Sequence, residues 1–593
     1  MKGFARPWGA LACVAALGAV VAPGATAGYS GPPQGTQTDS AFANSYARFG
    51  VTNVSATTQA TSCYAPEVEY FPGAGYPGYA DGGGTLCSAV NTGEDIGPYA
   101  QQDVHNDPML VKDHSESDIR VDPTNSNHLI GQSKWFVNAQ GYNHLLGFYE
   151  SWDGGENWTV QGHVPGYEGW TDNTDPVGAF DPWGNFYSLV LPYMFYYDKV
   201  GNHKYSNGAN LPNPTLPGEA ITVSVHPTAA TQTAANWRAN DYIFQSPQAV
   251  THDVDKQWIT IDTNPSGRDP FSGRAYAMWV LYNSFNSDHP FVSYAQTRPD
   301  GTHTAWSTPQ ELSSISGHPY DQYLLPHVDP DGVVYSTSTL NYPKQGYSTA
   351  DMTLVFSTDG GAAWQGPLPV LKNIQVPTYQ NTTFREGIVN SFAVGRTKMN
   401  GYYPLYVTYE DSSTGMSRIY LIASYDRGQS WTAPIQVDDG DQTDSSPGEA
   451  LQPSVNVAPS GTVGVTFYDR RLPCPTSDSR EATGSGIVYD PGTATSPGTP
   501  WGRANYCINT AIQFYRPNLT PIGHNVRLSA HTWDPQLSTA HTGCICSSGG
   551  FIGDYFGIDS GGGWTYTTSV STYDYGANPF FHQQQIVAKI ATR

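Results

Sequence analysis

Acidic, basic and tyrosyl side chains recur next to short β-rich stretches of this sequence, in combinations suited to acid–base chemistry. Asp255-Lys256 opens one such stretch, and Asp554-Tyr555 opens another. Hydrolysis of a glycosidic bond needs a proton donor and a second group, usually two carboxylates, that attacks or activates water. The candidate catalytic residues are Asp255, Glu386, Asp469, Asp554 and Tyr555, where Tyr555 would act as a nucleophile or a proton relay.

Basic residues near these acids are suited to hold an anionic group, because a guanidinium binds a carboxylate through paired, charge-assisted hydrogen bonds. The candidate substrate-binding residues are Asp175, Lys256, Arg385, Arg470 and Arg471. A structural interpretation stays open beside the catalytic one. In it, Asp255, Asp469 and Asp554 end strands and pair with bases such as Lys256 and Arg470.

A short pattern, S-x-D-x-G-x-x-W, occurs three times and indicates the elements that position these residues. The copies span 151–158, 357–364 and 424–431, and their acidic and aromatic members are Asp153 and Trp158, Asp359 and Trp364, and Asp426 and Trp431. The aspartate can accept hydrogen bonds from the next backbone N–H groups, while the glycine permits a positive φ. The tryptophan can fill the space between sheets. We expect these six residues to be structural.

The spacing of the pattern predicts a repeated unit of about 68 residues. Turns of the type Asp-Pro-x-Gly recur between the copies, as at 181–184 and 329–332. Aligning both signals gives units near 117–166, 171–238, 255–312, 320–374, 383–439, 451–529 and 551–590. We predict an all-β propeller of seven four-stranded antiparallel blades, with six blades as the alternative. In a propeller, a site lies where the starts of the innermost strands meet.

The pattern, together with Asp255-Lys256-Gln-Trp258, Phe467-Tyr-Asp469-Arg470-Arg471 and Gly553-Asp554-Tyr555, resembles secreted bacterial Asp-box (BNR) repeat proteins of the sialidase-like superfamily. The resemblance covers roughly residues 105–590. It implies a propeller with the boxes at its periphery and a glycosidase activity. True sialidases carry their first catalytic arginine in a Phe/Tyr-Arg-Ile-Pro motif, which this chain lacks; Asp118-Ile-Arg120-Val is the nearest stretch.

We expect an extracellular glycoside hydrolase of sialidase type, acting on a carbohydrate. Two alternatives stay open: a propeller that binds glycan or protein without catalysis, and a polysaccharide lyase. Function depends on the site rather than on the propeller, so the fold does not choose among them.

The first 27 residues predict a secretory signal, with Lys2 and Arg6, an apolar run at 10–22 and the small residues Ala25-Thr-Ala27. Residues 28–105 are expected to wrap the propeller and are the candidate source of a strand that closes the ring, and 106–593 are expected to form the propeller itself. Six later cysteines suit an exported protein with disulfides. Cys63–Cys87 and Cys474–Cys507 are the natural local pairs, and Cys544 and Cys546 are left over.

The net charge of −23 argues against binding to nucleic acid or to an anionic membrane, because both require clustered lysine and arginine. No cofactor and no metal ligand set is predicted. One side hypothesis is Ca²⁺ at the acidic loop 438–444, since Ca²⁺ prefers oxygen ligands on flexible loops. A monomer is expected.

Overall fold

The computed structural model contains seven four-stranded antiparallel sheets, arranged as the blades of a propeller. It describes residues 51–53 and 113–593. Within the second range, the segments outside the description are 137–143, 159, 165–166, 168–171, 194–195, 198–202, 205–218, 229–236, 239, 247–252, 266–268, 284–286, 317–320, 341–348, 376–378, 380–389, 439–448, 471–481, 483, 486–491, 494–495, 498–506, 530, 534, 536–539, 542–549, 556 and 574–582. The predicted signal peptide, nearly all of the predicted wrapping segment and all cysteines except Cys507 therefore lie outside the described residues.

The first four blades follow one another along the chain, each from its inner to its outer strand. Blade one is β2 (Asp113–Asp122), β3 (Asn125–Phe136), β4 (His144–Ser151) and β5 (Val160–His163). Blade two is β6 (Asp172–Phe180), β7 (Phe186–Tyr193), β10 (Glu219–His226) and β11 (Asp241–Ser246). Blade three is β12 (Val254–Ile261), β13 (Arg274–Asn283), β14 (Ser287–Gln296) and β15 (Gln310–Glu311). Blade four is β16 (Gln322–Val328), β17 (Val334–Leu340), β18 (Thr349–Ser357) and β19 (Gln365–Gln375).

The last three blades complete the ring. Blade five is β20 (Asn390–Val394), β21 (Leu405–Asp411), β22 (Arg418–Ser424) and β23 (Ile435–Gln436). Blade six is β24 (Ala450–Val457), β25 (Val463–Asp469), β28 (Asn509–Tyr515) and β29 (Pro521–Arg527). Blade seven is β32 (Ile558–Gly561), β33 (Trp564–Ser571), β34 (Gln584–Ala591) and β1 (Val51–Asn53). Three two-stranded ribbons add β8 (Tyr196–Tyr197) with β9 (His203–Lys204), β26 (Gly492–Thr493) with β27 (Ser496–Pro497), and β30 (Ala540–His541) with β31 (Gly550–Phe551).

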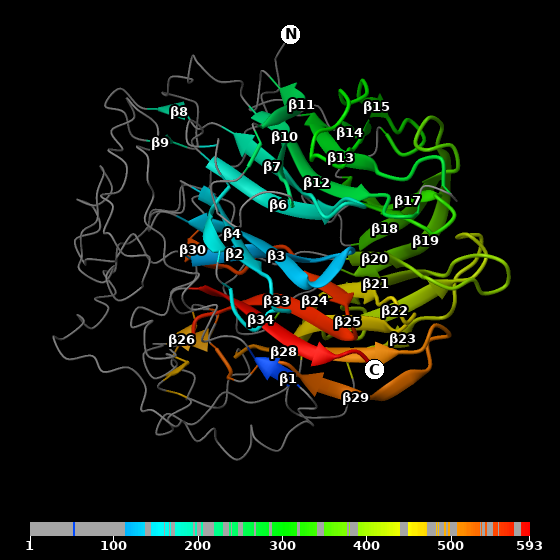
Figure 1. The fold of residues 1–593 in the computed structure, drawn as a ribbon. Coiled ribbons are helices and arrows are strands. Elements are labelled where there is room, and N and C mark those ends of the chain that lie inside the picture. Colours follow the sequence, from blue (N-terminus) through cyan, green and yellow to red (C-terminus); the bar gives the residue numbers. More distant parts are fainter. Residues whose placement is uncertain are drawn as a thin grey trace, which may run out of the picture.

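The ring is closed by contacts between successive inner strands and by pairing of the two ends of the chain. Each inner strand contacts the next, from β2 through β6, β12, β16, β20 and β24 to β32, which returns to β2. Strand β1 pairs antiparallel with β34, so the fourth strand of blade seven comes from the N-terminal part of the chain. Figure 1 shows the red strands β33 and β34 beside the blue strands β2 and β3. Closure covers edges that would otherwise expose unpaired backbone groups.

The hydrophobic core lies between neighbouring blades. One cluster joins blades two and three around Trp279, Ile221 and Leu189, and another joins blades four and five around Leu354 and Val407. Because each blade is covered on both faces, central strands such as β10 and β21 are buried along their whole length. Burying each large aliphatic side chain contributes about 1.5–3 kcal/mol. The seven-bladed prediction, with antiparallel four-stranded blades, is confirmed.

The three repeated sequence patterns form the same turn between the third and the outer strand of blades one, four and five. In the first, Asp153 Oδ1 accepts hydrogen bonds from Ser151 Oγ at 2.9 Å and from Asn157 N at 2.8 Å. Asp359 and Asp426 accept the equivalent pairs of bonds at 2.8 and 2.9 Å. Trp364 and Trp431 pack against core clusters, and Trp158 is buried. These carboxylates are occupied by local turn hydrogen bonds far from the inner strands.

Each inner strand begins at one face of the ring and ends at the opposite face, where it turns into the second strand. We call the opposite face the turn face. The Asp-Pro turns lie there: Asp181 Oδ1 accepts hydrogen bonds from Trp183 N and Asn185 N, both at 2.9 Å, and Asp329 accepts equivalent bonds. Among the described residues, no helix is long and apolar enough to cross a membrane.

Candidate functional site

The inner strands share a backbone irregularity near their starting ends. In five blades, the inner strand has a β-bulge, and at each bulge a residue other than glycine has a positive φ. These residues are Glu116 (φ 52°), Asp175 (51°), Lys256 (57°), Tyr323 (54°) and Gln452 (49°). Non-glycine residues held in this conformation store strain of about 1–3 kcal/mol each, and they concentrate at functional sites. A bulge also redirects side chains.

The redirected side chains meet where the inner strands begin, around two lysines. We call Glu116, Lys134, Asp175, Asp255, Lys256 and Asp554 the mouth cluster. Lys134, on the second strand of blade one, lies 3.5 Å from the Glu116 carboxylate and 3.8 Å from that of Asp175. Lys256 Nζ lies 3.0 Å from Asp554 Oδ2 and 3.6 Å from Asp255 Oδ2. Blades one, two, three and seven therefore contribute charges to one small region.

The most accessible acid of the mouth cluster is Asp255, whose side chain is 33% exposed, against 14% for Asp554 and 1% for Glu116. Lys256 also lies over the ring of Tyr323, with Nζ 5.5 Å from the ring centroid. Burial alone would lower the pKa of Lys256, but the Asp255 and Asp554 carboxylates raise it well above its usual value. Lys256 is therefore a permanent cation between two acids.

The surroundings push the pKa values of the mouth carboxyls in opposite directions. Burial and the neighbouring Asp175 charge raise the pKa of Glu116 well above its usual value. Burial would also raise the pKa of Asp175, but a hydrogen bond from Glu116 and the charges of Lys134 and Lys256 lower it. Burial raises the pKa of Asp255 despite the opposing charge of Lys256. The cluster thus holds carboxyl groups whose pKa values are shifted in opposite directions, which is how acid and base roles are assigned in many active sites.

Tyr555 lies beside the cluster without being activated by it. Its hydroxyl donates a hydrogen bond to the Pro176 carbonyl oxygen at 3.3 Å, and its ring meets that of Trp258 edge-on at 5.3 Å. Burial, with the Asp175 and Glu116 charges, raises the pKa of Tyr555 well above its usual value. A phenol in these surroundings stays protonated, because the charge of Lys256 opposes burial and the nearby acids only in part.

A further buried acid, Asp321, immediately precedes β16, the inner strand of blade four. Its carboxyl is fully buried, neither oxygen has a hydrogen-bond partner, and its N–H donates to Asp288 Oδ2 at 2.9 Å. Burial, with the Asp288 charge, raises the pKa of Asp321 to about 9. This acid is therefore protonated at neutral pH.

The structure brings together five of the sequence-predicted residues: Asp175, Asp255, Lys256, Asp554 and Tyr555. Asp469 and Arg470 are instead fully buried at the end of β25, the second strand of blade six, where Arg470 pairs with Glu449. Arg385, Glu386 and Arg471 lie outside the described residues. Lys256 and Arg470 both pair with acids, which agrees with the alternative prediction that these bases have a structural role.

Sequence reasoning missed Lys134 and the link between Glu116 and Asp175. Lys134 lies on β3, the second strand of blade one, away from the starts of the inner strands where the sequence predicts a site. The bulges carry no sequence signal, because the residue with positive φ is Glu, Asp, Lys, Tyr or Gln and never glycine in these five blades.

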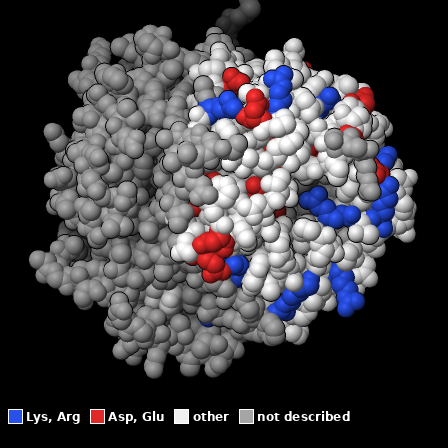
Figure 2. All heavy atoms as spheres, viewed as in Figure 1, with Lys and Arg blue, Asp and Glu red and all other residues white. Residues whose placement is uncertain are grey.

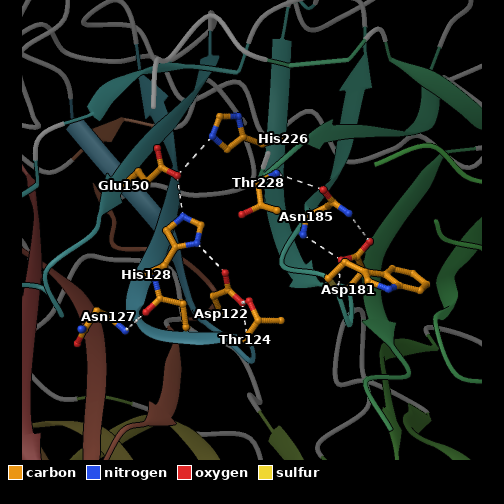
Figure 3. A network of polar contacts seen from close by, with 11 residues as sticks. Asp122, Thr124, Asn127, His128, Glu150, Asp181, Asn185, His226 and Thr228 are labelled. Carbon is orange, nitrogen blue, oxygen red and sulfur yellow. Dashed lines mark hydrogen bonds and ion pairs between the residues drawn. The ribbon is translucent and has the colours of Figure 1, made fainter. Parts of the chain in front are cut away.

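A second group of buried charges occupies the turn face of blades one and two (Figure 3). We call Asp122, His128, Glu150 and His226 the turn-face network. His128 Nδ1 lies 2.8 Å from Asp122 Oδ2, and His128 Nε2 lies 2.6 Å from Glu150 Oε1, which is also 3.4 Å from His226 Nε2. The His128 ring stacks on Trp152 with centroids 3.8 Å apart.

Opposite charges stabilise one another within the turn-face network. Burial alone would lower the pKa of His128, but its hydrogen bonds to Asp122 and Glu150 raise it. Burial would raise the pKa of Glu150, but hydrogen bonds with His128 and His226 lower it to about 2. The network is fully buried at His128 and Glu150, so no substrate reaches these groups.

The described residues show no group of three or more His, Cys, Asp or Glu side chains placed to hold a metal ion. In the acidic loop where the sequence suggested Ca²⁺, Asp438 is buried and pairs with Arg418 at 2.9 Å, and residues 439–444 lie outside the described residues. Cys507 is buried and disulfide-bonded, but its partner lies outside the described residues, so both predicted pairings stay predictions. On the face in Figure 2, described acidic and basic side chains form small separate groups of both signs.

No known protein family matches this chain, and no curated protein is similar to it. Solved structures with limited likeness include a Hadza microbial sialidase (14% identity over 60% of this chain and 63% of that chain, TM-score 0.37). They also include an α-L-arabinanase of Penicillium chrysogenum (12%, 70% and 92%, TM-score 0.34) and the polysaccharide lyase Uly1 (10%, 92% and 100%, TM-score 0.41). The first match spans less than two thirds of the sialidase chain. At TM-scores this low, these likenesses decide neither the family nor the reaction.

Proposed function

We propose that this protein is a glycan-acting hydrolase whose acid–base chemistry takes place at the mouth cluster. The proposal is supported mainly by the opposed pKa directions of Asp255 and Asp175, which lie close enough to influence one another. Asp255, whose pKa is raised and which is the most exposed of the mouth acids, donates a proton to the leaving oxygen. Asp175, ionised, acts as nucleophile or as the base that activates water.

The neighbouring groups have distinct roles in this proposal. Lys256 fixes Asp255 relative to Asp554, and Lys134 keeps Asp175 ionised. Tyr555 and Trp258 form an aromatic wall beside the acids rather than part of the reaction. The Asp-box pattern and the Asp255-Lys256-Gln-Trp258 segment, which resemble those of sialidase-like repeat proteins, favour a carbohydrate as substrate. Export from the cell, expected from the N-terminal sequence, would give access to extracellular glycan.

The test is turnover by purified wild-type protein on a panel of aryl glycosides and polysaccharides, followed by variants on any active substrate. Asp255→Asn should lower kcat by about 10²–10⁴-fold, the usual contribution of a general acid. Asp241→Asn is the matched control, because this acid is 61% exposed on the outer strand of blade two. Wild-type turnover in Asp255→Asn would refute the assignment. Product absorbing in the near ultraviolet would instead indicate a lyase.

A second candidate function, glycan binding without catalysis, is favoured by one observation. Each carboxylate of the mouth cluster has a lysine ammonium within 4.0 Å, as expected for a structural, charge-balanced rim. Saturable binding of an oligosaccharide, with no product after prolonged incubation, would select this function over hydrolysis.

A further inference from the structure

On the turn face, several inner strands end at an aspartate whose two carboxylate oxygens both have partners. These residues, in blades one, two and four, are Asp122, Asp181 and Asp329. One oxygen of each accepts hydrogen bonds from the backbone of its own turn. The other oxygen meets a side chain: His128 at 2.8 Å, Asn185 at 2.8 Å and Tyr335 at 3.1 Å, respectively. Figure 3 shows the first two of these contacts.

Blade three departs from this arrangement because its connection contains a second aspartate. Asp262 directly follows β12, and Asp269 lies further along the connection to β13, of which residues 266–268 are outside the described residues. Asp262 Oδ1 accepts a bond from Asn264 N at 2.9 Å, but Asp262 Oδ2 is buried without a hydrogen-bond partner. The carboxyl group of Asp269 lies close enough to Asp262 to share a proton with it. An acid therefore stands where the other blades have a donor.

We call Asp262 and Asp269 the carboxyl pair. Both are enclosed by protein, with exposed fractions of 0% and 3%. Within the described part of the chain, Arg274 forms no ion pair with either of them; its guanidinium donates to the Gly360 carbonyl oxygen at 2.8 Å and lies over two aromatic rings. Burial and the contact with Asp269 raise the pKa of Asp262 to about 8. Two facing carboxylates need a proton or a cation between them.

The hydroxyl of Tyr276 is a second buried group without a partner at this place. Tyr276 occupies in β13 the position that Tyr335 occupies in β17, and Tyr335 donates to its strand-end aspartate. Tyr276 is 0% exposed, yet its hydroxyl makes no hydrogen bond. Burial and the charges of Asp262 and Asp269 raise its pKa against the opposing charge of Arg274, so the hydroxyl is near the pair. Several buried polar atoms without partners in one place require an explanation, and an ion is one.

The chemistry of these groups favours Ca²⁺. Two carboxylates and a hydroxyl are hard oxygen ligands, and their two negative charges balance a divalent cation. Ca²⁺ takes six to eight oxygens in flexible geometry, water included, whereas Mg²⁺ requires a nearly regular octahedron. Asp269 is held in place by Phe271 N at 2.8 Å and Asn264 Nδ2 at 3.2 Å. The same amide of Asn264 donates to the Asp329 carbonyl oxygen of blade four at 2.7 Å.

We propose that the carboxyl pair, together with the Tyr276 hydroxyl, binds a structural Ca²⁺ ion between the turns of blades three and four. The proposal goes beyond the hydrolase function and does not depend on it, because the mouth cluster lies at the opposite face. Only two acids contribute, which is compatible with the lack of any group of three acidic, cysteine or histidine ligands among the described residues. The site is also separate from the acidic loop 438–444.

The test is thermal unfolding of the full-length protein, freed of metal ions with EDTA and then supplied with calcium, magnesium or sodium chloride at equal ionic strength. Extracellular Ca²⁺ modules bind with dissociation constants of about 10⁻⁴–10⁻³ M. In about 10 mM calcium chloride, the unfolding midpoint of the wild type should therefore rise by about 3 °C or more above its value in sodium chloride. Magnesium chloride should raise it by less than about half as much.

Asp262→Asn is the variant that tests the site, because the amide removes one ligand charge. It should abolish the rise caused by calcium. Without calcium its midpoint should be no lower than that of the wild type, since the amide can donate a hydrogen bond to Asp269 where two carboxyl groups otherwise meet. Asp331→Asn is the matched control: it removes one charge from the same face of blade four, where Asp331 is 45% exposed and pairs with Lys398. It should keep the full rise.

Each outcome supports or overturns the proposal. A rise in the wild type and in Asp331→Asn that is absent from Asp262→Asn supports it. No rise in the wild type overturns it, as does a full rise in Asp262→Asn, which would place the ion elsewhere. An equal rise with magnesium overturns the choice of Ca²⁺. If Asp262→Asn does not fold, Asp269→Asn provides the same comparison.

Discussion

The mouth cluster and the turn-face network both bury acids and bases together, yet they differ in backbone and in charge balance. In the turn-face network, none of the four residues has a positive φ, and His128 lies between two carboxylates whose pKa values it lowers. In the mouth cluster, Glu116, Asp175 and Lys256 have positive φ, and the pKa values of Glu116 and Asp175 move apart. Mutual stabilisation indicates a structural role, whereas strain combined with mixed protonation is typical of functional sites.

The largest expected effect on stability comes from breaking the turn-face network. Glu150→Ala should lower the free energy of unfolding by about 3–5 kcal/mol, because it leaves buried His128 without one of its two anionic partners. Chemical denaturation at pH 7 measures this. The pKa of Glu150 is lowered to about 2, so its contribution is present above the unfolded value near 4.5 and is lost as pH falls through about 2. The deficit of the variant should therefore shrink on acidification; an unchanged deficit would contradict the charge-based account.

Asp321, which immediately precedes β16, should behave in the opposite way. Its folded pKa of about 9 is raised, so the fold is favoured below the unfolded value near 3.8 and loses stability as pH rises toward 9. Asp321→Asn removes this penalty. It should stabilise the protein by about 2 kcal/mol or more at pH 8 relative to its effect at pH 4, because the amide takes up no proton on folding. Thermal unfolding across this pH range tests the sign.

The repeated turns should show intermediate, uniform losses. Asp153→Ala removes a carboxylate that accepts hydrogen bonds from Ser151 Oγ and Asn157 N, so we expect a loss of about 1 kcal/mol. Asp359→Ala and Asp426→Ala should give the same loss, because their hydrogen bonds are equivalent. Denaturant titration of the three variants compares them, and a loss of enzymatic turnover in any one would argue against a purely structural role.

The smallest expected change in stability is that of Glu116→Gln. Because burial raises the pKa of Glu116 well above its usual value, we expect the neutral amide to replace the carboxyl group with a change of only about 0.5 kcal/mol or less. This small change in the free energy of unfolding contrasts with the large loss expected for Glu150→Ala, although both acids are almost completely buried. Chemical denaturation at pH 7 provides the measurement. A loss as large as that in the turn-face network would show that Glu116 is ionised, and would remove the main difference between the two regions.

Much of the fold was predictable because its signals are local. The box at 151–158 makes its hydrogen bonds within eight residues, and the Asp-Pro turns do so within five, so both leave a readable pattern. Their spacing gave seven units whose limits agree closely with the seven sheets. Asp255 and Lys256 were found because they lie at the beginning of a recognisable strand, β12.

The site was predictable only in part because its contacts are distant in sequence. Lys256 reaches Asp554 across 298 residues, and Lys134 approaches Asp175 from a different blade. Asp469 and Arg470 carry the right chemistry beside a strong strand, but that strand is the second of its blade, so they are buried with Glu449 instead.

The sequence by itself determined the blades, their order and the structural role of the turn aspartates, because hydrogen bonds between near neighbours depend on residue type and spacing. Only the tertiary structure decided which charges meet at the mouth cluster and in which direction the pKa of each acid is shifted. Those properties depend on ring closure, on burial and on bulges in the inner strands. They arise when distant segments exclude water together, and no single segment encodes them.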